Sequence, residues 1–139
     1  MDLDLSSLES SVVALERAYG VSTDKVLWGQ LSPAIQEAVK AGVIQCFEVA
    51  YEQSWKMTQR WLEINRSPSA LAGATRRHLY RIAAESALID DVELWMTFNK
   101  ARNQTSHTYD RHVAQAVFDS AGAFLAHTSK LLARLKEAQ

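Results

Sequence analysis

The chain has 139 residues, of which 47% are apolar and 22% are charged, and its formal net charge is −1. This length is enough for one domain with a sizeable hydrophobic core, and the composition excludes a disordered chain. The nearly balanced charge excludes a protein that binds polyanions over its whole surface. We therefore expect residues 1–139 to form a single globular domain, in which any nucleic-acid contact comes from a local patch.

The sequence also favours a cytoplasmic location. Its uncharged apolar runs are only a few residues long, which excludes a transmembrane helix. The N-terminal letters MDLD are acidic, whereas a signal peptide begins with basic residues. The single cysteine, Cys46, cannot form an internal disulfide, and beside Phe47 we expect it to be a small core residue.

Apolar residues recur at helical spacing in the first part of the chain. The first run extends from Leu5 to Tyr19, and Gly20 is expected to end it. The segment from Val21 to Leu31 has no clear period, and we expect a loop that carries Trp28. Helix therefore predominates from the beginning, as the scarcity of proline and glycine also indicates.

A long helix is predicted next. Ser32 supplies a capping hydroxyl and Pro33 suits the first helical position. Apolar residues then recur at a four-residue step as far as Glu63, so the helix would be about 45 Å long. A helix of this length in a small domain is typical of the central element of a bundle.

Three more helices are expected in the second half. Residues 65–73 form a connection, and Thr75 can cap a helix that reaches Leu88 and Ile89. The pair Asp90-Asp91 can cap a helix over residues 92–104, and Asp110 can open the last one. The apolar face of that last helix comprises Val113, Val117, Ala121, Phe124, Leu131 and Leu132. Together these elements predict an all-α fold, an antiparallel four-helix up-and-down bundle with an additional short helix.

The segment from Lys100 to Asp110 has the most chemically informative composition. It places Arg102, His107 and Tyr109 within eight residues, where a helical apolar pattern gives way to polar residues. Arginine can hold a phosphate through two parallel hydrogen bonds, and histidine exchanges protons near neutral pH. This pair suits phosphodiester chemistry without a metal.

Each of these residues also has a structural explanation. Trp95, Phe98 and Arg102 share one helix face, so Arg102 could instead form a salt bridge to Glu48 or Glu52, or cap the helix end.

His107 could interact with the helix dipole, and Tyr109 could be a packed interfacial aromatic residue. On a continuous helix Arg102 and His107 would point about 140° apart. They converge only if the helix loosens near residues 104–106, or if they meet across a symmetry axis.

A second basic run surrounds Tyr80. Arg76, Arg77 and Arg81 could contact an RNA backbone, with Tyr80 available to stack on a base. An ordinary solvated helix face is the alternative.

The sequence contains no recognisable metal or cofactor motif. The four histidines form no i, i+4 pair and no Cys/His cluster, and there is no glycine-rich phosphate loop. We therefore expect neither a metal nor a cofactor.

These residues resemble a known family. Arg102-Asn103 followed by His107 matches the Arg-x4–6-His signature of HEPN domains, and Tyr109 extends it to Arg-x4-His-x-Tyr. The wider pattern is similar to the branch called nucleotidyltransferase substrate-binding proteins, over about residues 43–117. It comprises Ile89-Asp90-Asp91, Trp95, Ser106 to Asp110, Phe47-Glu48, Tyr51-Glu52 and Trp55-Lys56.

The resemblance implies a small helical bundle that forms a homodimer and brings two Arg/His motifs together. Arg102 and His107 would then be catalytic in a metal-independent endoribonuclease, with Asn103 orienting a phosphate oxygen or capping the helix. It also implies a cognate minimal nucleotidyltransferase (MNT), paired with the nuclease as antitoxin and toxin. The partner would silence the nuclease by transferring adenylyl groups to Tyr109.

We therefore predict a HEPN-type ribonuclease, the toxin of a HEPN/MNT module, which acts on RNA. Two alternatives remain: a non-catalytic subunit that presents substrate to the nucleotidyltransferase, and a purely structural helical adaptor.

Overall fold

The computed structural model describes residues 2–139, which form seven α-helices and one 3₁₀-helix and contain no β-strand. In chain order these are α1 (Ser6–Thr23), α2 (Lys25–Gln30), α3 (Pro33–Asn65), α4 (Pro68–Leu71), α5 (Arg76–Glu85), α6 (Val92–Asn103), η1 (Gln104–His107) and α7 (Arg111–Glu137). The predicted all-α bundle is confirmed: α1, α3, α6 and α7 are its four main helices and α5 is the additional short one. The remaining helices, α2 and α4, are short segments of six and four residues in the connections on either side of α3.

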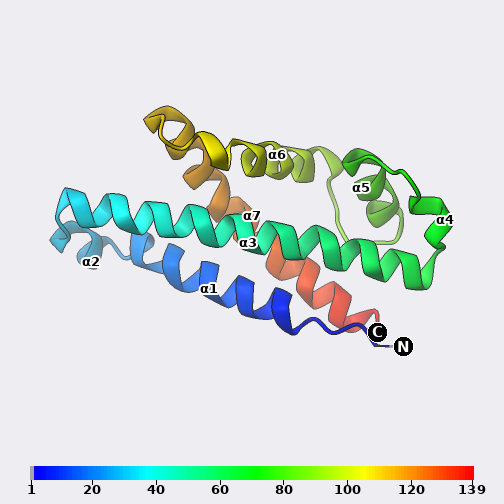
Figure 1. Ribbon diagram of the computed structural model, residues 1–139. Helices are drawn as coiled ribbons and strands as arrows, with labels where there is room; N and C mark the ends of the chain where they lie inside the picture. Colours follow the sequence, from blue (N-terminus) through cyan, green and yellow to red (C-terminus); the bar gives the residue numbers. More distant parts are fainter. Residues whose placement is uncertain (1) are drawn as a thin grey trace.

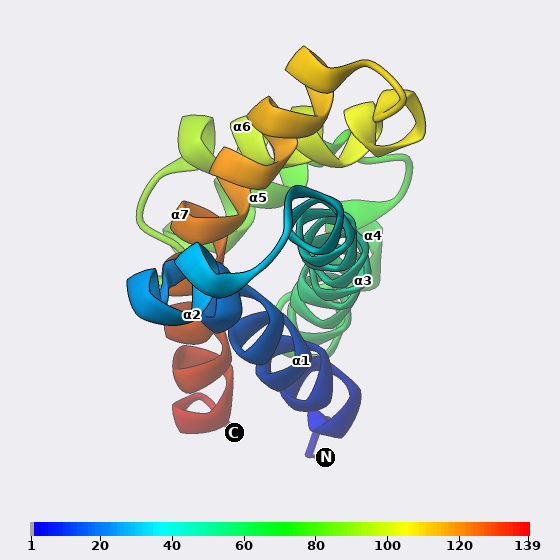
Figure 2. The same cartoon turned by 90° about the vertical axis from the view of Figure 1, so that its left-hand side faces the viewer.

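The main helices run up and down around α3. Figure 1 shows α1 running to one end, α3 returning, α6 running out again and α7 returning to the end where both termini lie. The side chain of Gln139 donates a hydrogen bond to the carbonyl oxygen of Leu3 at 3.1 Å, which joins the two termini. In the end-on view of Figure 2, the turn between α6 and α7 lies on the opposite side of α3 from α1. The polar turn that follows α6 is therefore exposed at one end of the molecule.

A cluster of aromatic rings fixes α6 between α3 and α7. Phe124 of α7 lies at its centre, with ring centroids 5.0 Å from Phe47, 5.3 Å from Phe98 and 5.8 Å from Trp95. The rings meet at steep angles, an arrangement that favours contact between a ring edge and a ring face. All four residues are at most 2% exposed, so the apolar faces predicted for these helices form the core.

Local capping explains where the helices begin. The hydroxyl oxygen of Ser32 accepts a hydrogen bond from the backbone N–H of Ile35. In the same way Asp91 accepts from Leu94, which confirms the predicted start of α6. These side chains satisfy backbone N–H groups that have no partner within the helix.

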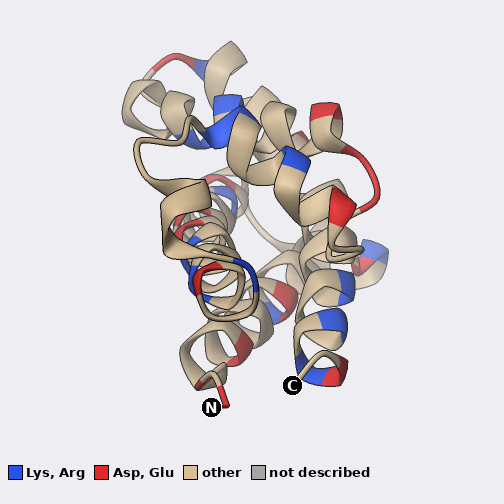
Figure 3. Ribbon diagram, turned by 90° about the vertical axis from the view of Figure 1, so that its right-hand side faces the viewer, with Lys and Arg blue, Asp and Glu red and all other residues tan. Residues whose placement is uncertain are grey.

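Asp90, the other member of the predicted capping pair, has a different role. It forms ion pairs with Arg134 at 2.9 Å and Lys130 at 3.4 Å, and so ties the α5–α6 connection to α7. The hydrogen bond from Arg134 lowers the pKa of the Asp90 carboxyl below its usual value. Basic residues follow one another along this part of α7, next to the C label in Figure 3.

The predicted loop over residues 21–31 is wrong. Gly20 does not end α1, which continues to Thr23, and most of the remaining segment forms α2. Asp24 caps this short helix by accepting a hydrogen bond from the N–H of Leu27 at 3.1 Å. A helix of six residues is too short to show an apolar period, so the pattern missed it.

The predicted end of α5 is also wrong, because the helix stops at Glu85 and not at Ile89. Ala87 adopts a positive φ of 62°, and the N–H of Leu88 returns to the carbonyl oxygen of Ala83 at 2.9 Å. This arrangement closes a helix, although glycine is the usual residue at the positive-φ position. Leu88 and Ile89 are buried in the connection that follows, and their apolar character extended the pattern beyond the helix.

In the connection after α3, Ser67 caps the four-residue helix α4, which the sequence pattern did not indicate. Among residues 2–139, no helix combines the length and the hydropathy needed to cross a membrane.

Candidate functional site

The candidate site lies where α6 loosens into η1. The hydroxyl of Thr105 donates to the backbone carbonyl oxygen of Arg102 at 2.8 Å. The hydroxyl of Thr108 donates to the backbone carbonyl oxygen of Thr105 at 3.3 Å. Side chains thus take up carbonyl groups as the helix tightens into a 3₁₀ turn. The helix therefore does loosen near residues 104–106, which was one of the two conditions for Arg102 and His107 to converge.

Arg102 is engaged by acidic side chains of α3. Its Nε–H donates to Glu52 Oε1 at 3.0 Å, and its Nη2 lies 3.4 Å from Glu48 Oε1. Its Nη1 donates to the hydroxyl of Thr105 at 3.4 Å. The salt bridge that the sequence offered as an alternative for Arg102 is therefore present, and the side chain is 29% exposed.

Glu52 is itself held by further contacts. Its second carboxylate oxygen accepts a hydrogen bond from the indole N–H of Trp55 at 3.1 Å. The guanidinium of Arg76 lies over the Trp55 ring, 3.5 Å from the ring centroid. A continuous set of contacts thus runs from Arg76 of α5 through Trp55 and Glu52 of α3 to Arg102 of α6.

His107 and Tyr109 are exposed to solvent. Tyr109 is 85% exposed, and its ring lies edge-on to that of His107 with centroids 6.2 Å apart. Within residues 2–139, neither side chain makes a hydrogen bond. Asn103, the last residue of α6, is exposed as well.

The single chain does not join Arg102 to His107. Arg102 points to the carboxylates of α3, and no hydrogen bond links it to His107 among the residues that the structure describes. The two groups therefore lie at the same helix end but not in one closed site.

Two buried tyrosines link α6 to the core through hydrogen bonds. The hydroxyl of Tyr51 lies 2.6 Å from that of Tyr80 and donates to Asn99 Oδ1 at 2.8 Å. Burial raises the pKa of Tyr51 to about 12 and that of Tyr80 well above its ordinary value, so both phenols are neutral at physiological pH. They connect α3, α5 and α6.

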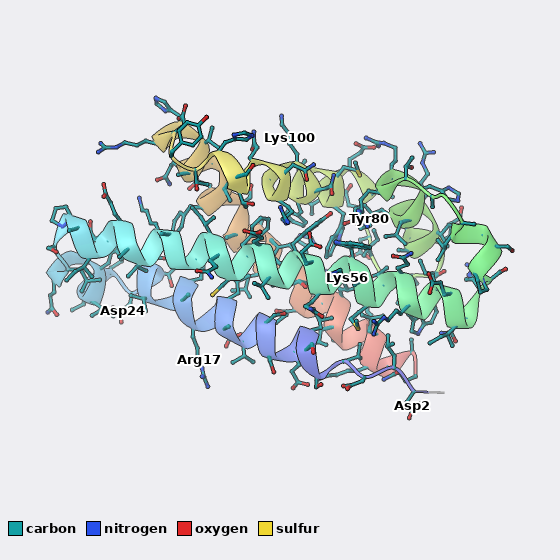
Figure 4. The ribbon with its side chains drawn as sticks, viewed as in Figure 1. Asp2, Arg17, Asp24, Lys56, Tyr80 and Lys100 are labelled. Atoms are coloured by element: carbon teal, nitrogen blue, oxygen red, sulfur yellow. The ribbon has the colours of Figure 1, made fainter. Side chains whose placement is uncertain are left out.

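The prediction that Tyr80 is available to stack on a base is wrong. Tyr80 is 1% exposed and lies between α5 and α3, as Figure 4 shows, whereas Lys100 lies on the outer side of α6. Its neighbours in the sequence are basic, but Tyr80 falls on the face of α5 that is turned to the core.

The three arginines of this run have different surroundings. Arg76 lies on Trp55, Arg77 forms an ion pair with Glu93, and Arg81 is exposed. Of the three, Arg76 is the one connected to the Arg102 cluster, through the Trp55 and Glu52 contacts described above.

A cleft of about 360 Å³ adjoins the His107–Tyr109 turn, between α3 and the beginning of α7. Its lining includes Lys40 and Ile44 from α3, Thr108 from the turn and Arg111 from the beginning of α7. The sequence patterns did not indicate this cleft, because its walls come from segments far apart in the chain. Nor did they indicate Asn99, although its place three residues before Arg102 put it on the same helix face.

Within residues 2–139, the structure brings together no group of three or more His, Cys, Asp or Glu side chains that could hold a metal ion. Cys46 is half-buried against the core, as a small core residue would be.

Comparison with known proteins gives the family of this chain. Residues 3–137 match the family described as nucleotidyltransferase substrate binding protein like. A Haemophilus influenzae protein named probable ribonuclease HepT is 35% identical over 137 residues, which cover 97% of this chain and 93% of that protein.

Two solved structures share the fold. One, from Haemophilus influenzae, is described as the fold of a substrate binding domain of a nucleotidyltransferase. It has a TM-score of 0.88 and 32% identity, over 96% of this chain and 99% of that chain. A crystal structure from Thermus thermophilus has a TM-score of 0.72 and 26% identity, over 92% and 98% of the two chains. This chain therefore belongs to the HEPN-like family of nucleotidyltransferase substrate-binding proteins.

Proposed function

We propose that this protein is a HEPN-type endoribonuclease that cleaves RNA without a metal, and that Arg102 and His107 carry the reaction. The main support is their placement: a guanidinium fixed by α3 and a solvent-exposed imidazole share one helix end. The 35% identity to a protein named as a probable ribonuclease, over nearly the whole chain, favours the same activity.

The chemistry assigns each group a task. The 2′-hydroxyl attacks the neighbouring phosphorus and loses its proton to a base, and the bond from phosphorus to the 5′-oxygen breaks. An acid then protonates that oxygen, which leaves a 2′,3′-cyclic phosphate and a 5′-hydroxyl. Arg102 stabilises the charged phosphorane, and Asn103 orients one of its oxygens.

A homodimer supplies the second proton carrier. One His107 cannot act as base and acid in the same step, whereas two copies can share the tasks. The exposure of His107 and Tyr109 leaves this edge free to meet a second copy. If both copies of His107 are needed, dimers assembled from wild type and His107→Ala chains will show activity that follows the square of the wild-type fraction. A linear dependence would show that each chain works alone.

The direct test compares two exposed histidines. In buffer containing EDTA, His107→Ala should lose cleavage by at least about a hundredfold, as expected when an acid–base group is removed. His112→Ala, a few residues further on and also exposed, is the matched control and should retain activity. RNA left intact by the wild-type protein, with Tyr109 shown by mass spectrometry to be unmodified, would refute the ribonuclease.

We also propose that the protein is a cytoplasmic toxin that a minimal nucleotidyltransferase neutralises by adenylylating Tyr109. The phenol is 85% exposed and its ring lies beside His107, so an added adenylyl group would place bulk and negative charge at the catalytic edge. Co-expression with an active transferase should add mass to the wild-type chain and none to Tyr109→Phe. An equal mass gain in both chains would exclude Tyr109 as the modified residue.

Basic residues of α5 are proposed as contacts to the RNA backbone. Arg81 is exposed, and Arg76 and Arg77 lie on the same short helix. Arg81→Ala should weaken RNA binding by a similar factor for all RNA sequences. The slope of the logarithm of the binding constant against the logarithm of the salt concentration should fall by about the contribution of one phosphate contact.

A second function is favoured by the acidic surroundings of Arg102. Because Glu48 and Glu52 already occupy its guanidinium, the chain could serve as a non-catalytic subunit that presents substrate to a nucleotidyltransferase. That function requires stable association with the transferase after Arg102 and His107 are both replaced, together with an absence of RNA cleavage by the wild-type chain.

A further inference from the structure

Two glutamates of α3 contact Arg102, and they are held with different firmness. We propose that Glu52 is a positioning residue that aims the Arg102 guanidinium, whereas Glu48 is a competing carboxylate that the RNA phosphate must displace. This inference rests on the ribonuclease proposed above and assigns opposite roles to two residues of the same type. Both lie one helical turn apart on α3.

Glu52 is fixed on both of its oxygens. One accepts the Nε–H of Arg102 at 3.0 Å, and the other accepts the indole N–H of Trp55 at 3.1 Å. Lys56 lies 4.0 Å from the second oxygen, and Arg76 covers the Trp55 ring. Because Glu52 cannot rotate without breaking these contacts, it holds the plane of the guanidinium in one orientation.

Glu48 has much weaker support. Its carboxylate lies 3.4 Å from Arg102 Nη2 and is 41% exposed. Among residues 2–139, this ion pair is the one polar contact of its side chain. An exposed ion pair of this length contributes little to stability, so an incoming anion can replace it at small cost.

The geometry of the guanidinium separates the two roles. Glu52 occupies Nε, while Nη1 and Nη2 make only contacts of 3.4 Å, to Thr105 and Glu48. A phosphate can take both terminal nitrogens in a bidentate arrangement while Nε remains bonded to Glu52. Glu48 must leave for this to happen, whereas Glu52 need not move.

Charge points the same way. Arg102 and Lys56 only balance the charges of Glu48 and Glu52, so the cluster offers a phosphate no net positive charge. Neutralising Glu48 gives the cluster one net positive charge and leaves the Nε contact intact.

The experiment separates KM from kcat. Glu48→Gln should lower the KM for RNA about two- to fivefold, the range of an exposed ion pair, and leave kcat unchanged. Glu52→Ala should lower kcat about tenfold to a hundredfold, because the guanidinium loses its fixed orientation. Glu52→Gln should recover part of that loss, since its amide oxygen can still accept the Nε–H, which a merely structural role would not predict.

A matched control removes the effect of net charge. Glu63→Gln makes the same charge change on α3, about 16 Å from Glu52, and should change neither constant. If Glu52→Ala fails to fold, Glu52→Gln and the NMR signal of the Arg102 Nε–H still report the contact. That signal should be protected from exchange in wild type and in Glu48→Gln, and should keep partial protection in Glu52→Gln, whose amide oxygen can still accept the Nε–H.

Binding of a non-cleavable 2′-deoxy oligonucleotide to chains that also carry His107→Ala tests the competition without any catalysis. Tighter binding by Glu48→Gln, with no change in Glu63→Gln, supports the inference even if the wild-type chain proves not to be a nuclease. Weaker or unchanged binding by Glu48→Gln overturns the competing role. An unchanged kcat in an active Glu52→Ala protein overturns the positioning role.

Discussion

The two halves of the Arg102–His107 motif differ in how they are supported. Arg102 contacts carboxylates on α3, and the helix that carries it is fixed by a buried aromatic cluster. His107 and Tyr109 project from a 3₁₀ turn into solvent and contact each other. The comparison shows that of two residues five apart in sequence, one can be held by ion pairs while the other is exposed to solvent, because the helix ends between them.

This difference suits the proposed roles. A phosphate clamp needs a fixed direction, and a helix packed into the core supplies it. Groups that meet a second copy, RNA or a modifying partner must be accessible, and a turn at the surface supplies that. If the two halves are independent, a substitution in one should leave the structure of the other unchanged.

The largest effect is expected from the core beneath the Arg102 half. Phe124→Ala removes the central ring of the aromatic cluster and should lower the free energy of unfolding by about 3–5 kcal/mol. Urea denaturation measures this directly. Phe118→Ala, on the same helix but half-buried, is the control and should cost clearly less. Equal costs would show that the cluster does not anchor α6.

A smaller loss is expected from the tyrosine pair. Tyr51→Phe leaves Tyr80 and Asn99 without their shared partner and should cost about 1–3 kcal/mol, while the exposed Tyr109→Phe should cost nothing measurable. The comparison of the two variants by urea denaturation at pH 7 reports whether the buried network supports α6.

The pH dependence provides a second measurement on the same residue. The pKa of Tyr51 is raised from 10.0 to about 12 in the folded chain, so the unfolded chain loses this proton first. The stability that this phenol contributes is therefore complete below pH 10 and is lost as the pH rises towards 12. Tyr51→Phe should show a shallower fall in stability over that window. An identical fall in both proteins would exclude Tyr51 as a cause.

Replacing the two motif residues should have different effects on stability, although the proposed mechanism needs both of them for cleavage. Arg102→Ala leaves Glu48 and Glu52 without their cation and should lower stability by about 1 kcal/mol after allowance for solvent screening. His107→Ala should not change the melting temperature, because its side chain has no hydrogen bond among the described residues. Thermal denaturation of both variants measures this difference. Equal melting temperatures would contradict the conclusion that Arg102 is structurally supported and His107 is not.

Much of the fold could be predicted because capping is local chemistry. Ser32, Asp91 and Asp110 each mark a helix start through a side chain and a backbone group two or three residues away. Apolar spacing likewise indicated the faces that meet in the core. The apolar signal fails at α2, whose six residues are too few to show a period although Asp24 caps it. It also fails at the end of α5, where the buried residues Leu88 and Ile89 continue the apolar pattern beyond the helix.

The candidate site depended on pairings that spacing cannot decide. Whether Arg102 would meet Glu48 and Glu52 or a ligand depends on the rotation of α6 against α3, since the partners lie about 50 residues apart. Tyr80 was assigned to the surface from its basic neighbours, but the rotation of α5 buries it. The roles of Arg102, Asn103, His107, Tyr109 and the three arginines of α5 remain predictions.

The smallest effect is expected in the exposed half, at the end of its turn. Asp110 Oδ1 accepts hydrogen bonds from the N–H groups of His112 at 2.8 Å and Val113 at 3.3 Å, and its own N–H donates to His107 at 3.2 Å. Asp110→Ala should cost about 0.5–1 kcal/mol, and Asp110→Asn should restore most of it because asparagine caps helices equally well. Hydrogen exchange should accelerate at residues 108–113 in Asp110→Ala.

If the two halves are independent, exchange along α6 will stay as slow as in the wild-type protein, because the aromatic cluster and the Tyr51–Tyr80 pair do not depend on this cap. Cleavage should then fall through kcat, as His107 loses its fixed turn, while RNA binding at Arg102 is retained. Faster exchange at Phe98 or Asn99 would show instead that the turn and the α6 segment that carries Arg102 open together. Arg102 and His107 would then belong to one cooperative unit, in spite of their different exposure.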